Sequence, residues 1–219
     1  MTFTVRAARN QPEIDAIHQL YVDAFADEDP DDIGPWSVSD EREARQMIRE
    51  TLAQSSFLVP ILTEQLALYQ GGELIGAVTT EIDHRTLNWV FGEPDDGQKA
   101  HRITALLYHS RVIGRIVVRP DRQGHGVGAA LLRAMEERGL QRGVLWFCGI
   151  AVSEDSARFF RYNGYDVHGM ETEGKPLQLL YPDLAIPLDV PGGSGFHKRF
   201  GDKKYVGPAL VRAQRFARN

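Results

Sequence analysis

The stretch RIVVRPDRQGHGVGAALLRAMEERG, residues 115–139, constrains the fold more than any other part of the sequence. It begins with β-branched residues, which favour strands, and ends with Ala, Leu, Met, Glu and Arg, which favour helices. Between the two runs, Gly124, Gly126 and Gly128 stand at alternate positions, although one or two glycines suffice for an ordinary turn. The stretch therefore predicts a strand, a tight turn and a helix over about 126–139.

Such a turn is suited to binding phosphate. A helix that begins directly after a glycine-rich loop directs unpaired N–H groups, and the positive end of its dipole, at whatever lies over the loop. Glycines lack a Cβ atom, so the backbone can approach a ligand closely. Arg122 and His125 could add hydrogen-bond donors. The spacing favours a phosphate site over a plain strand-to-helix turn.

Two other phosphate loops fit these residues poorly. The nucleotide-hydrolase loop GxxxxGK[ST] needs a lysine, and none stands at 125–135. The dinucleotide loop GxGxxG needs an acid about 20 residues further on. Here GHGVGA fits only with Ala129 in the last place, and the next strand ends CGIAV without an acid.

The rest of the chain predicts further strands and helices around this unit. Before it, the periodicity indicates a strand (FTVRAAR), two helices (PEIDAIHQLYVDAFAD and SDEREARQMIRETLAQS) and a hairpin around Gly71-Gly72 (LALYQGGELIGAVTTEID). The polar segment 85–104 is interpreted as an insertion before a strand at about 106–118. After the unit follow a strand (GVLWFCGIAV), a short helix (SEDSARFFRYNG), a strand (YDVHGM) and a final strand (LQLLYP).

A length of 219 residues predicts one core with an appendage. The run PGGSG, residues 191–195, is interpreted as a linker, so we divide the chain into a main domain, 1–190, and a basic C-terminal extension, 191–219. Residues 192–219 carry a net charge of +6 and the rest of the chain −11. The extension could pack onto the acidic body, which we favour, or contact nucleic acid through its interleaved basic and aromatic residues.

Composition points to a globular protein of the cytoplasm. The apolar share is 42% and the charged share 25%, and the longest apolar runs fall short of the roughly 20 residues of a membrane span. We see no export signal and expect no membrane partner. The single cysteine, Cys148, cannot form an internal disulfide, and its apolar surroundings predict a buried thiol in a strand.

Two motifs carry a resemblance to a known family. The turn reads [Q/R]-x-x-G-x-[G/A] after a strand ending in Val-x-Pro, and the second motif is an aromatic pair followed by Gly-aromatic, within SARFFRYNGY. Both motifs resemble those of the acyl-CoA-dependent N-acetyltransferase superfamily, GNAT, as does the order of elements over residues 3–181. The matching residues are Val118, Pro120, Gln123, Gly126, Gly128, Phe159, Phe160, Gly164 and Tyr165. The resemblance implies an α/β (α+β) fold, in which helices flank a mixed, mostly antiparallel sheet with a splayed central strand pair.

The resemblance also implies acetyl-CoA as co-substrate and no metal. The amides from Gln123 through Ala129 would receive the pyrophosphate, and the backbone of Ile116 and Val118 would pair with the pantetheine arm. The amide near Ile116 would polarise the thioester carbonyl as an oxyanion donor. The implied cofactor-binding residues are Ile116, Val117, Val118, Arg122, Gln123, Gly124, His125, Gly126, Val127, Gly128 and Ala129.

The implied reaction moves the acetyl group to a primary amine by direct attack in a ternary complex. Because such amines are mostly protonated at pH 7, some group must accept a proton. The glutamate that the family often uses falls here at Val112, which cannot ionise. The predicted strand ends offer Glu81, Asp83, His84 and His109, of which we choose Glu81 and His109 as catalytic. The family's tyrosine acid falls at Phe160, and Tyr162 is rotated about 200° away along the helix.

The acceptor stays open between a small amine, a peptide N-terminus and a protein lysine. The acidic run DAFADEDPDDIGPW, between the first two helices, would favour a cationic amine. Two other functions also stay open. One is a catalytically silent acyl-CoA-binding module, suggested by Val112, Phe160 and the insertion 85–104. The other is an RNA-associated protein that acts through the basic extension, and a homodimer is compatible with each.

Overall fold

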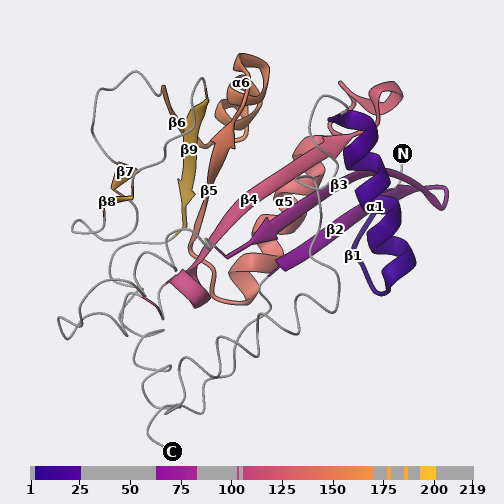
Figure 1. Ribbon diagram of the computed structural model, residues 1–219, viewed down its shortest axis with the longest axis horizontal. Coiled ribbons are helices and arrows are strands. Elements are labelled where there is room, and N and C mark those ends of the chain that lie inside the picture. Colours follow the sequence, from indigo (N-terminus) through magenta and orange to yellow (C-terminus); the bar gives the residue numbers. More distant parts are fainter. Residues whose placement is uncertain are drawn as a thin grey trace, which may run out of the picture.

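The structure is a computed structural model that describes residues 3–25, 63–82, 103, 106–169, 177–178, 185–186 and 193–200. Its main sheet has seven strands in the order β1-β2-β3-β4-β5-β9-β6 (Figure 1). Neighbouring strands are antiparallel, except for the parallel pair β4 and β5. This confirms the predicted mixed, mostly antiparallel sheet. The strands are β1 (Thr4–Ala7), β2 (Thr63–Gln70), β3 (Glu73–Glu81), β4 (Ser110–Val118), β5 (Trp146–Ala151), β6 (Asp166–Gly169) and β9 (Ser194–Arg199).

Two helices cover opposite faces of the sheet (Figure 1). Helix α1 (Gln11–Ala24) buries Ile17 and Tyr21 against residues of β2, β3 and β4. Helix α5 (Val127–Gln141) buries Leu131, Leu132 and Met135 against the other face. Because strand side chains alternate between faces, these strands present small residues such as Ala67 and Ala77 to α1 and larger ones such as Leu66 and Val78 to α5.

The predictions for the first helix and the hairpin are confirmed. Asn10 caps α1 by accepting a hydrogen bond from the Glu13 N–H, and Pro12 stands in the first turn. Strands β2 and β3 pair on either side of the Gly71-Gly72 turn. The predicted second helix lies outside the described residues, as does the insertion 85–104 apart from Ile103.

The strand predicted at about 106–118 begins later than expected. Residues 106–109 are helical, and β4 begins only at Ser110. The Ser110 hydroxyl donates to the Leu106 carbonyl, and the Arg111 guanidinium donates to the Leu107 carbonyl, each at 2.9 Å. These two side chains satisfy carbonyls that the short helical segment leaves unpaired, which apolar periodicity alone does not reveal.

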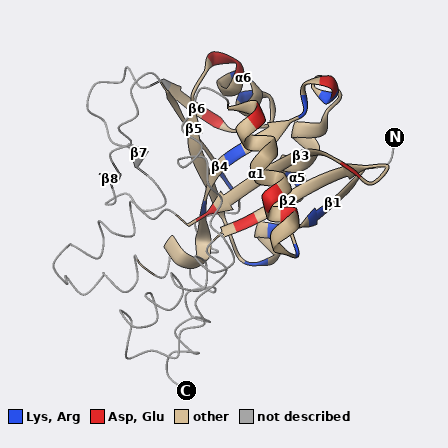
Figure 2. Ribbon diagram, turned by 45° about the vertical axis from the view of Figure 1, so that its right-hand side comes forward, with Lys and Arg blue, Asp and Glu red and all other residues tan. Residues whose placement is uncertain are grey.

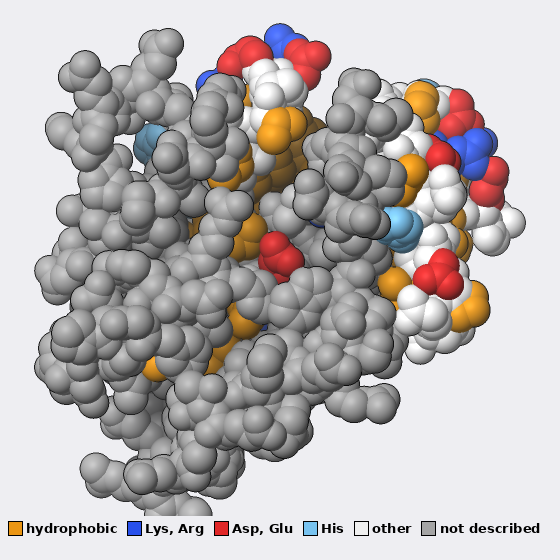
Figure 3. Space-filling view, viewed as in Figure 1, with side chains coloured by type: hydrophobic (Ala, Val, Ile, Leu, Met, Phe, Trp, Pro, Cys, Tyr) orange, Lys and Arg blue, Asp and Glu red, His pale blue; other side chains and the backbone are white. Residues whose placement is uncertain are grey.

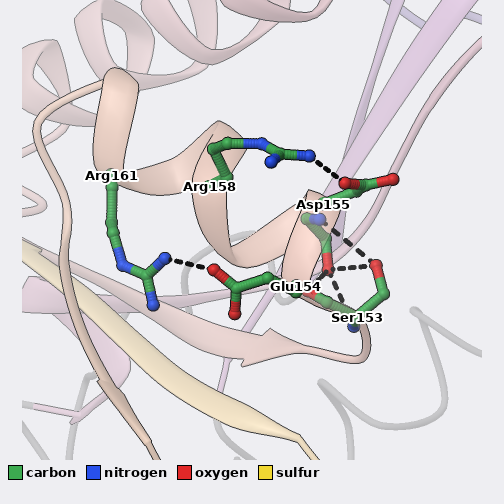
Figure 4. A network of polar contacts seen from close by, with 6 residues as sticks. Ser153, Glu154, Asp155, Arg158 and Arg161 are labelled. Carbon is green, nitrogen blue, oxygen red and sulfur yellow. Dashed lines mark hydrogen bonds and ion pairs between the residues drawn. The ribbon is translucent and has the colours of Figure 1, made fainter.

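Helix α6 (Glu154–Tyr162) is short and is held by side chains at its first turn (Figure 4). Ser153 is the N-cap and forms a reciprocal capping box with Ser156. Glu154 pairs with Arg161 and Asp155 with Arg158 along the exposed side. A helix of nine residues is marginal in isolation, so the cap and its buried aromatic face fix its position.

The last strand of the main sheet is β9, not the predicted final strand LQLLYP. Of that segment, Leu177–Gln178 form β7, which pairs with β8 (Ala185–Ile186) in a separate two-stranded sheet. Strand β9 lies between β5 and β6, within the segment that we interpreted as linker and basic extension. The division at 190/191 stays a prediction, but 194–199 belong to the main sheet.

Two side chains fix β9 on the α5 side of the sheet. Phe196 is 1% exposed and belongs to the main core cluster. The Lys198 ammonium donates to a Glu136 carboxylate oxygen and to the Asn163 carbonyl, each at 2.9 Å. These contacts join β9 to α5 and to the end of α6.

Strands β4 and β5 pair over three residues only. The pairs are Ser110 with Trp146, Arg111 with Phe147 and Val112 with Cys148. Beyond them β4 continues along β3 and β5 along β9, so the two strands diverge, as Figure 1 shows. This is the predicted splayed central pair. Within the described residues, no helix is long and apolar enough to cross a membrane.

Replacing Phe196 with alanine should lower the free energy of unfolding by about 3–5 kcal/mol, the usual cost of removing a buried phenylalanine. Urea unfolding would measure it, with Val152→Ala as the control. Val152 is 66% exposed, and its truncation should change stability by less than about 0.5 kcal/mol. Equal stabilities of the two variants would show that β9 does not contribute to the core.

Candidate functional site

A β-bulge in β4 marks the point where the central strands separate. Thr79 pairs with Arg115, but Thr80 pairs with Ile113, so Gly114 is an extra residue on β4. A bulge bends its strand and increases its twist, and bulges recur beside active sites. Gly114 follows the last residue that β4 pairs with β5, Val112, by two positions. The bulge therefore turns β4 away from β5 and opens the gap.

The edge of β4 that faces this gap carries backbone groups directed away from β3. The Arg119 N–H donates to the Ile75 carbonyl of β3 at 3.0 Å. In an antiparallel pair, every second residue directs its backbone N–H and C=O groups to the partner strand. The N–H and C=O groups of Arg115 and Val117 therefore point to β3, and those of Ile116 and Val118 point to the side that β5 has left. An extended ligand could pair with this edge as an added strand does.

The glycine turn lies at the end of the same edge. After a short 3-10 helix (Pro120–Arg122), Gly124 and Gly126 adopt left-handed conformations with φ of +75° and +78°. A Cβ atom at either position would meet no atom within 4 Å. Gln123 connects the turn to β4, because its side-chain amide donates to the Val118 carbonyl at 3.1 Å.

The N-terminus of α5 has no side-chain cap. Gly126 is its N-cap, and the first intrahelical bond runs from the Ala130 N–H to the Gly126 carbonyl at 3.0 Å. The N–H groups of Val127, Gly128 and Ala129 therefore have no partner within the helix. This end of the helix can bind an anion through backbone donors.

The other predicted residues of the turn have structural contacts. The Arg122 guanidinium lies 3.3 Å from an Asp121 carboxylate oxygen, and His125 Nδ1 lies 2.7 Å from the Gln123 carbonyl. A Cβ at Gly128 would stand 3.1 Å from the Phe159 ring. Gly128 is thus needed for the close packing of α5 against α6, a role that its place in the motif did not reveal.

Glu81 lies at the gap. It is the register partner of Val112, so the two side chains share one face of the sheet. Its carboxylate oxygen lies 3.5 Å from where a Cβ of Gly114 would stand, which places the carboxylate over the bulge. In the space-filling view, an acidic side chain and several apolar ones are visible near the centre of the drawn face (Figure 3).

His109 lies on the other side of the paired residues. It is 5% exposed, and its Nδ1 lies 2.8 Å from the Gly143 carbonyl. The three paired residues of β4, Ser110 to Val112, separate His109 from the gap. The structure thus brings only one of the two chosen catalytic residues to the bulge. Asp83 and His84 lie outside the described residues.

An aromatic cluster lies where β4 and β5 separate. Phe160 is 3% exposed and stacks on Phe196, with ring centroids 3.6 Å apart. A Cβ at Gly149 would collide with the Phe196 ring and stand 2.9 Å from the Ile113 carbonyl, so Phe196 lies against the point of divergence. We missed Phe196 because its strand was interpreted as a linker and tail. Tyr162 is 85% exposed, as its helical position predicted.

A row of mainly polar side chains, interrupted by Val112, crosses the opposite face of the sheet. Successive register partners are Glu81, Val112, Cys148, His197 and Asp166. Cys148 is buried, as predicted, and its thiol lies 3.8 Å from the Arg111 carbonyl. Burial, followed by the neighbouring His168, lowers the pKa of His197.

Tyr21 was not among the predicted site residues, although it stands beside the bulge. Its hydroxyl lies 2.9 Å from Thr79 Oγ1 and donates to the Arg115 carbonyl at 3.5 Å. Burial raises the pKa of this phenol well above its ordinary value. Only its apolar helical spacing was visible in the sequence, which indicates a core residue. Among the described residues, no group of three or more His, Cys, Asp or Glu side chains could hold a metal ion.

Comparisons with known proteins bear on the family and the fold of the chain. The sequence model of the Acetyltransferase (GNAT) family matches residues 14–165, more than half of the chain. A search of curated proteins found no significant match.

Several solved structures share the fold. A Lactobacillus plantarum protein assigned as an N-acetyltransferase is 20% identical, with a TM-score of 0.53 over 92% of this chain and 100% of that one. Tetrahymena GCN5 is 9% identical, with a TM-score of 0.53 over 92% and 97%. The PaiA N-acetyltransferase of Thermoplasma acidophilum, solved with coenzyme A, is 13% identical, with a TM-score of 0.51 over 91% and 100%. At such low identity the likeness shows the fold alone.

Proposed function

Because the chain belongs to the GNAT family of acetyltransferases, we propose that it moves an acetyl group from acetyl-CoA to a primary amine by direct attack in a ternary complex. One observation carries the proposal. The edge of β4 that faces the gap begins at the Gly114 bulge and leads, through the short 3-10 helix and the glycine turn, to the uncapped N-terminus of α5. A ligand with an extended amide-containing arm and a pyrophosphate at its end fits this succession of groups.

Each part of acetyl-CoA has a proposed partner. The backbone of Ile116 and Val118 pairs with the amides of the pantetheine arm, beside Val117 in the same strand. The pyrophosphate accepts hydrogen bonds from the amides of the turn, from Gln123 and Gly124 through His125 and Gly126 to Val127, Gly128 and Ala129, with Arg122 nearby. Backbone donors at a helix N-terminus suit this role, because the helix dipole also favours the negative charge.

We propose Glu81 as the group that accepts the proton of the attacking amine. The family's glutamate position is Val112 here, and Glu81 is its direct neighbour on β3, on the same face. Compared with the family's position, the carboxylate therefore comes from the neighbouring strand β3 and still lies at the bulge. His109 is not favoured, since its imidazole is buried against the Gly143 carbonyl below the paired residues.

The reaction proceeds without a tyrosine acid at position 160. Phe160 has no proton to donate, and its ring lies in the aromatic cluster behind the gap. A thiolate is a tolerable leaving group because thiols have pKa values near 8.5, so water or the substrate ammonium can supply the proton.

Two observations bear on the alternatives. The position of Glu81 favours an enzyme over a silent acyl-CoA-binding module, because Glu81 can supply at the bulge the carboxylate that Val112 lacks. The alternative of an RNA-associated protein rests on the basic extension, of which the structure describes only residues 193–200; Figure 2 shows basic and acidic positions on the described helices and strands. The acceptor amine stays unassigned, because the acidic run between the first two helices lies outside the described residues, apart from its first three residues.

The proposed activity is tested by CoA release from acetyl-CoA with a panel of small amines, peptides and lysine-containing proteins. Release that depends on an amine supports the enzyme. Binding of acetyl-CoA without release for every acceptor class would support the silent module.

Gly126→Asn should weaken acetyl-CoA binding at least about tenfold, or about 1.4 kcal/mol, because the new side chain would stand where the pyrophosphate lies. Asparagine tolerates left-handed backbone better than most residues, so the fold should persist. Gly143→Asn is the matched control, since Gly143 has φ +87° and equally open surroundings at the far end of α5. Calorimetric titration that gave both variants the wild-type affinity would refute the assignment of the turn.

Glu81→Gln should lower kcat/KM by roughly 10²–10⁴, the range for a lost general base. A carboxylate base works only when deprotonated, so the wild-type rate should fall as pH falls through its pKa, and this limb should disappear in the variant. His109→Asn, which keeps an N–H donor for Gly143, should cost less than about threefold, far below that range. The opposite order of the two losses would make His109 the base.

A further inference from the structure

Tyr21 contacts the sheet at the residue that follows the bulge. The side chain comes from α1, is 1% exposed, and its hydroxyl reaches Thr79 on β3 and the Arg115 carbonyl on β4. Arg115 directly follows Gly114, the extra residue of the bulge. A buried hydroxyl needs a hydrogen-bond partner, but Thr79 alone would satisfy that need. The second contact, at 3.5 Å, places the phenol on the backbone of the site.

The Arg115 carbonyl belongs to the same peptide unit as the Ile116 N–H. In a trans peptide these two groups point in opposite directions. The carbonyl therefore points to β3 and Tyr21, and the N–H points into the gap between β4 and β5. Under the proposed function, this N–H donates to the oxygen of the thioester carbonyl, where negative charge develops.

We infer that Tyr21 is a positioning residue for this oxyanion donor: its hydroxyl holds and polarises the Arg115–Ile116 peptide through the carbonyl on the opposite side. The inference rests on the proposed function. A hydrogen bond to a carbonyl draws electron density toward the oxygen and makes the N–H of that peptide a stronger donor, because bonded groups in a chain polarise one another.

Thr79 completes the chain of hydrogen bonds. The Tyr21 hydroxyl has one proton, and when it donates to the Arg115 carbonyl, the Thr79 hydroxyl donates to the Tyr21 oxygen at 2.9 Å. The sequence of donors then runs from Thr79 to Tyr21, through the Arg115–Ile116 peptide, to the developing oxyanion. Burial keeps the pKa of Tyr21 well above its ordinary value, so the phenol remains protonated and able to donate throughout the working pH range.

Tyr21→Phe should lower kcat by about tenfold, a fraction of the 10²–10³ lost when an oxyanion-hole donor is removed outright. The KM for acetyl-CoA should stay within about twofold, since the donor acts on charge that develops only in the transition state. Tyr69→Phe is the control: Tyr69 packs against the same α1 cluster but stands on β2. An unchanged kcat in Tyr21→Phe, or an equal loss in Tyr69→Phe, would overturn the inference.

A second measurement separates donor strength from packing. Tyrosines with one or two ring fluorines, incorporated at position 21, keep the hydroxyl and nearly the same shape while making it a stronger donor. If Tyr21 polarises the peptide, kcat should rise with fluorination by about twofold to threefold, as expected for Brønsted behaviour. A kcat that is independent of fluorination would show that the residue only fills space. This test holds even if Tyr21→Phe folds poorly.

Thr79 offers an independent pair of variants. Thr79→Ser keeps the hydroxyl and should retain kcat within about twofold, whereas Thr79→Val removes the first donor of the chain and should lower kcat by about threefold. Equal rates for the two would contradict the chain. Failure of the proposed function is seen separately, because the wild-type protein would then release no CoA with any acceptor.

Discussion

The bulge at Gly114 is the constraint on which the site depends. One extra residue on β4 shifts its register against β3 and turns the strand away from β5 directly after the Val112–Cys148 pair. Among the described strands, none pairs with Ile116 and Val118 on the β5 side, so their backbone groups on that side face the gap that leads toward the glycine turn. Glu81 and Tyr21 meet β4 within this short segment, from the neighbouring strand and from α1. A regular strand would have continued to pair with β5, and no edge would have remained for a ligand.

A divergent strand pair needs support from outside, because the two strands no longer hold each other. On the β4 side, β3 pairs with the strand from Val112 to Val118, and α1 and α5 pack on its two faces. On the β5 side, β9 pairs with all six residues, and its Phe196 lies against Gly149 at the point of divergence. The partly buried pair of Lys198 and Glu136 joins β9 to α5, which begins at the glycine turn. The strand that closes the sheet therefore also supports the gap.

The sequence predicted what depends on short-range pattern. The turn with its three glycines, the hairpin at Gly71-Gly72 and the buried Cys148 were all predictable, because periodicity and backbone preference act over a few residues. The place of β9 was not, because SGFHKR alternates weakly and begins in a glycine-rich run, so that its partners on β5 and β6 determine its structure. Because β9 was not predicted, the place of Phe196 in the core was not predicted either. Tyr21 shows a second limit, since its apolar spacing identified a core residue, but only the tertiary contact with Arg115 gives its hydroxyl a role.

The site also separates two kinds of requirement. The groups that would hold the cofactor are backbone amides and carbonyls, which every residue carries, so the sequence there is restricted mainly where left-handed φ or close packing demands glycine, as at Gly126 and Gly128. Proton transfer needs a particular side chain, but only near a particular point in space. Val112 and Glu81 are cross-strand neighbours on one face, so a carboxylate from either strand reaches the bulge. Under the proposed function, a chain can thus lose the acid from β4 and keep the chemistry, provided that the register between β3 and β4 stays fixed. In this protein the bulge fixes that register, so the same residue that opens the gap also places the carboxylate beside it.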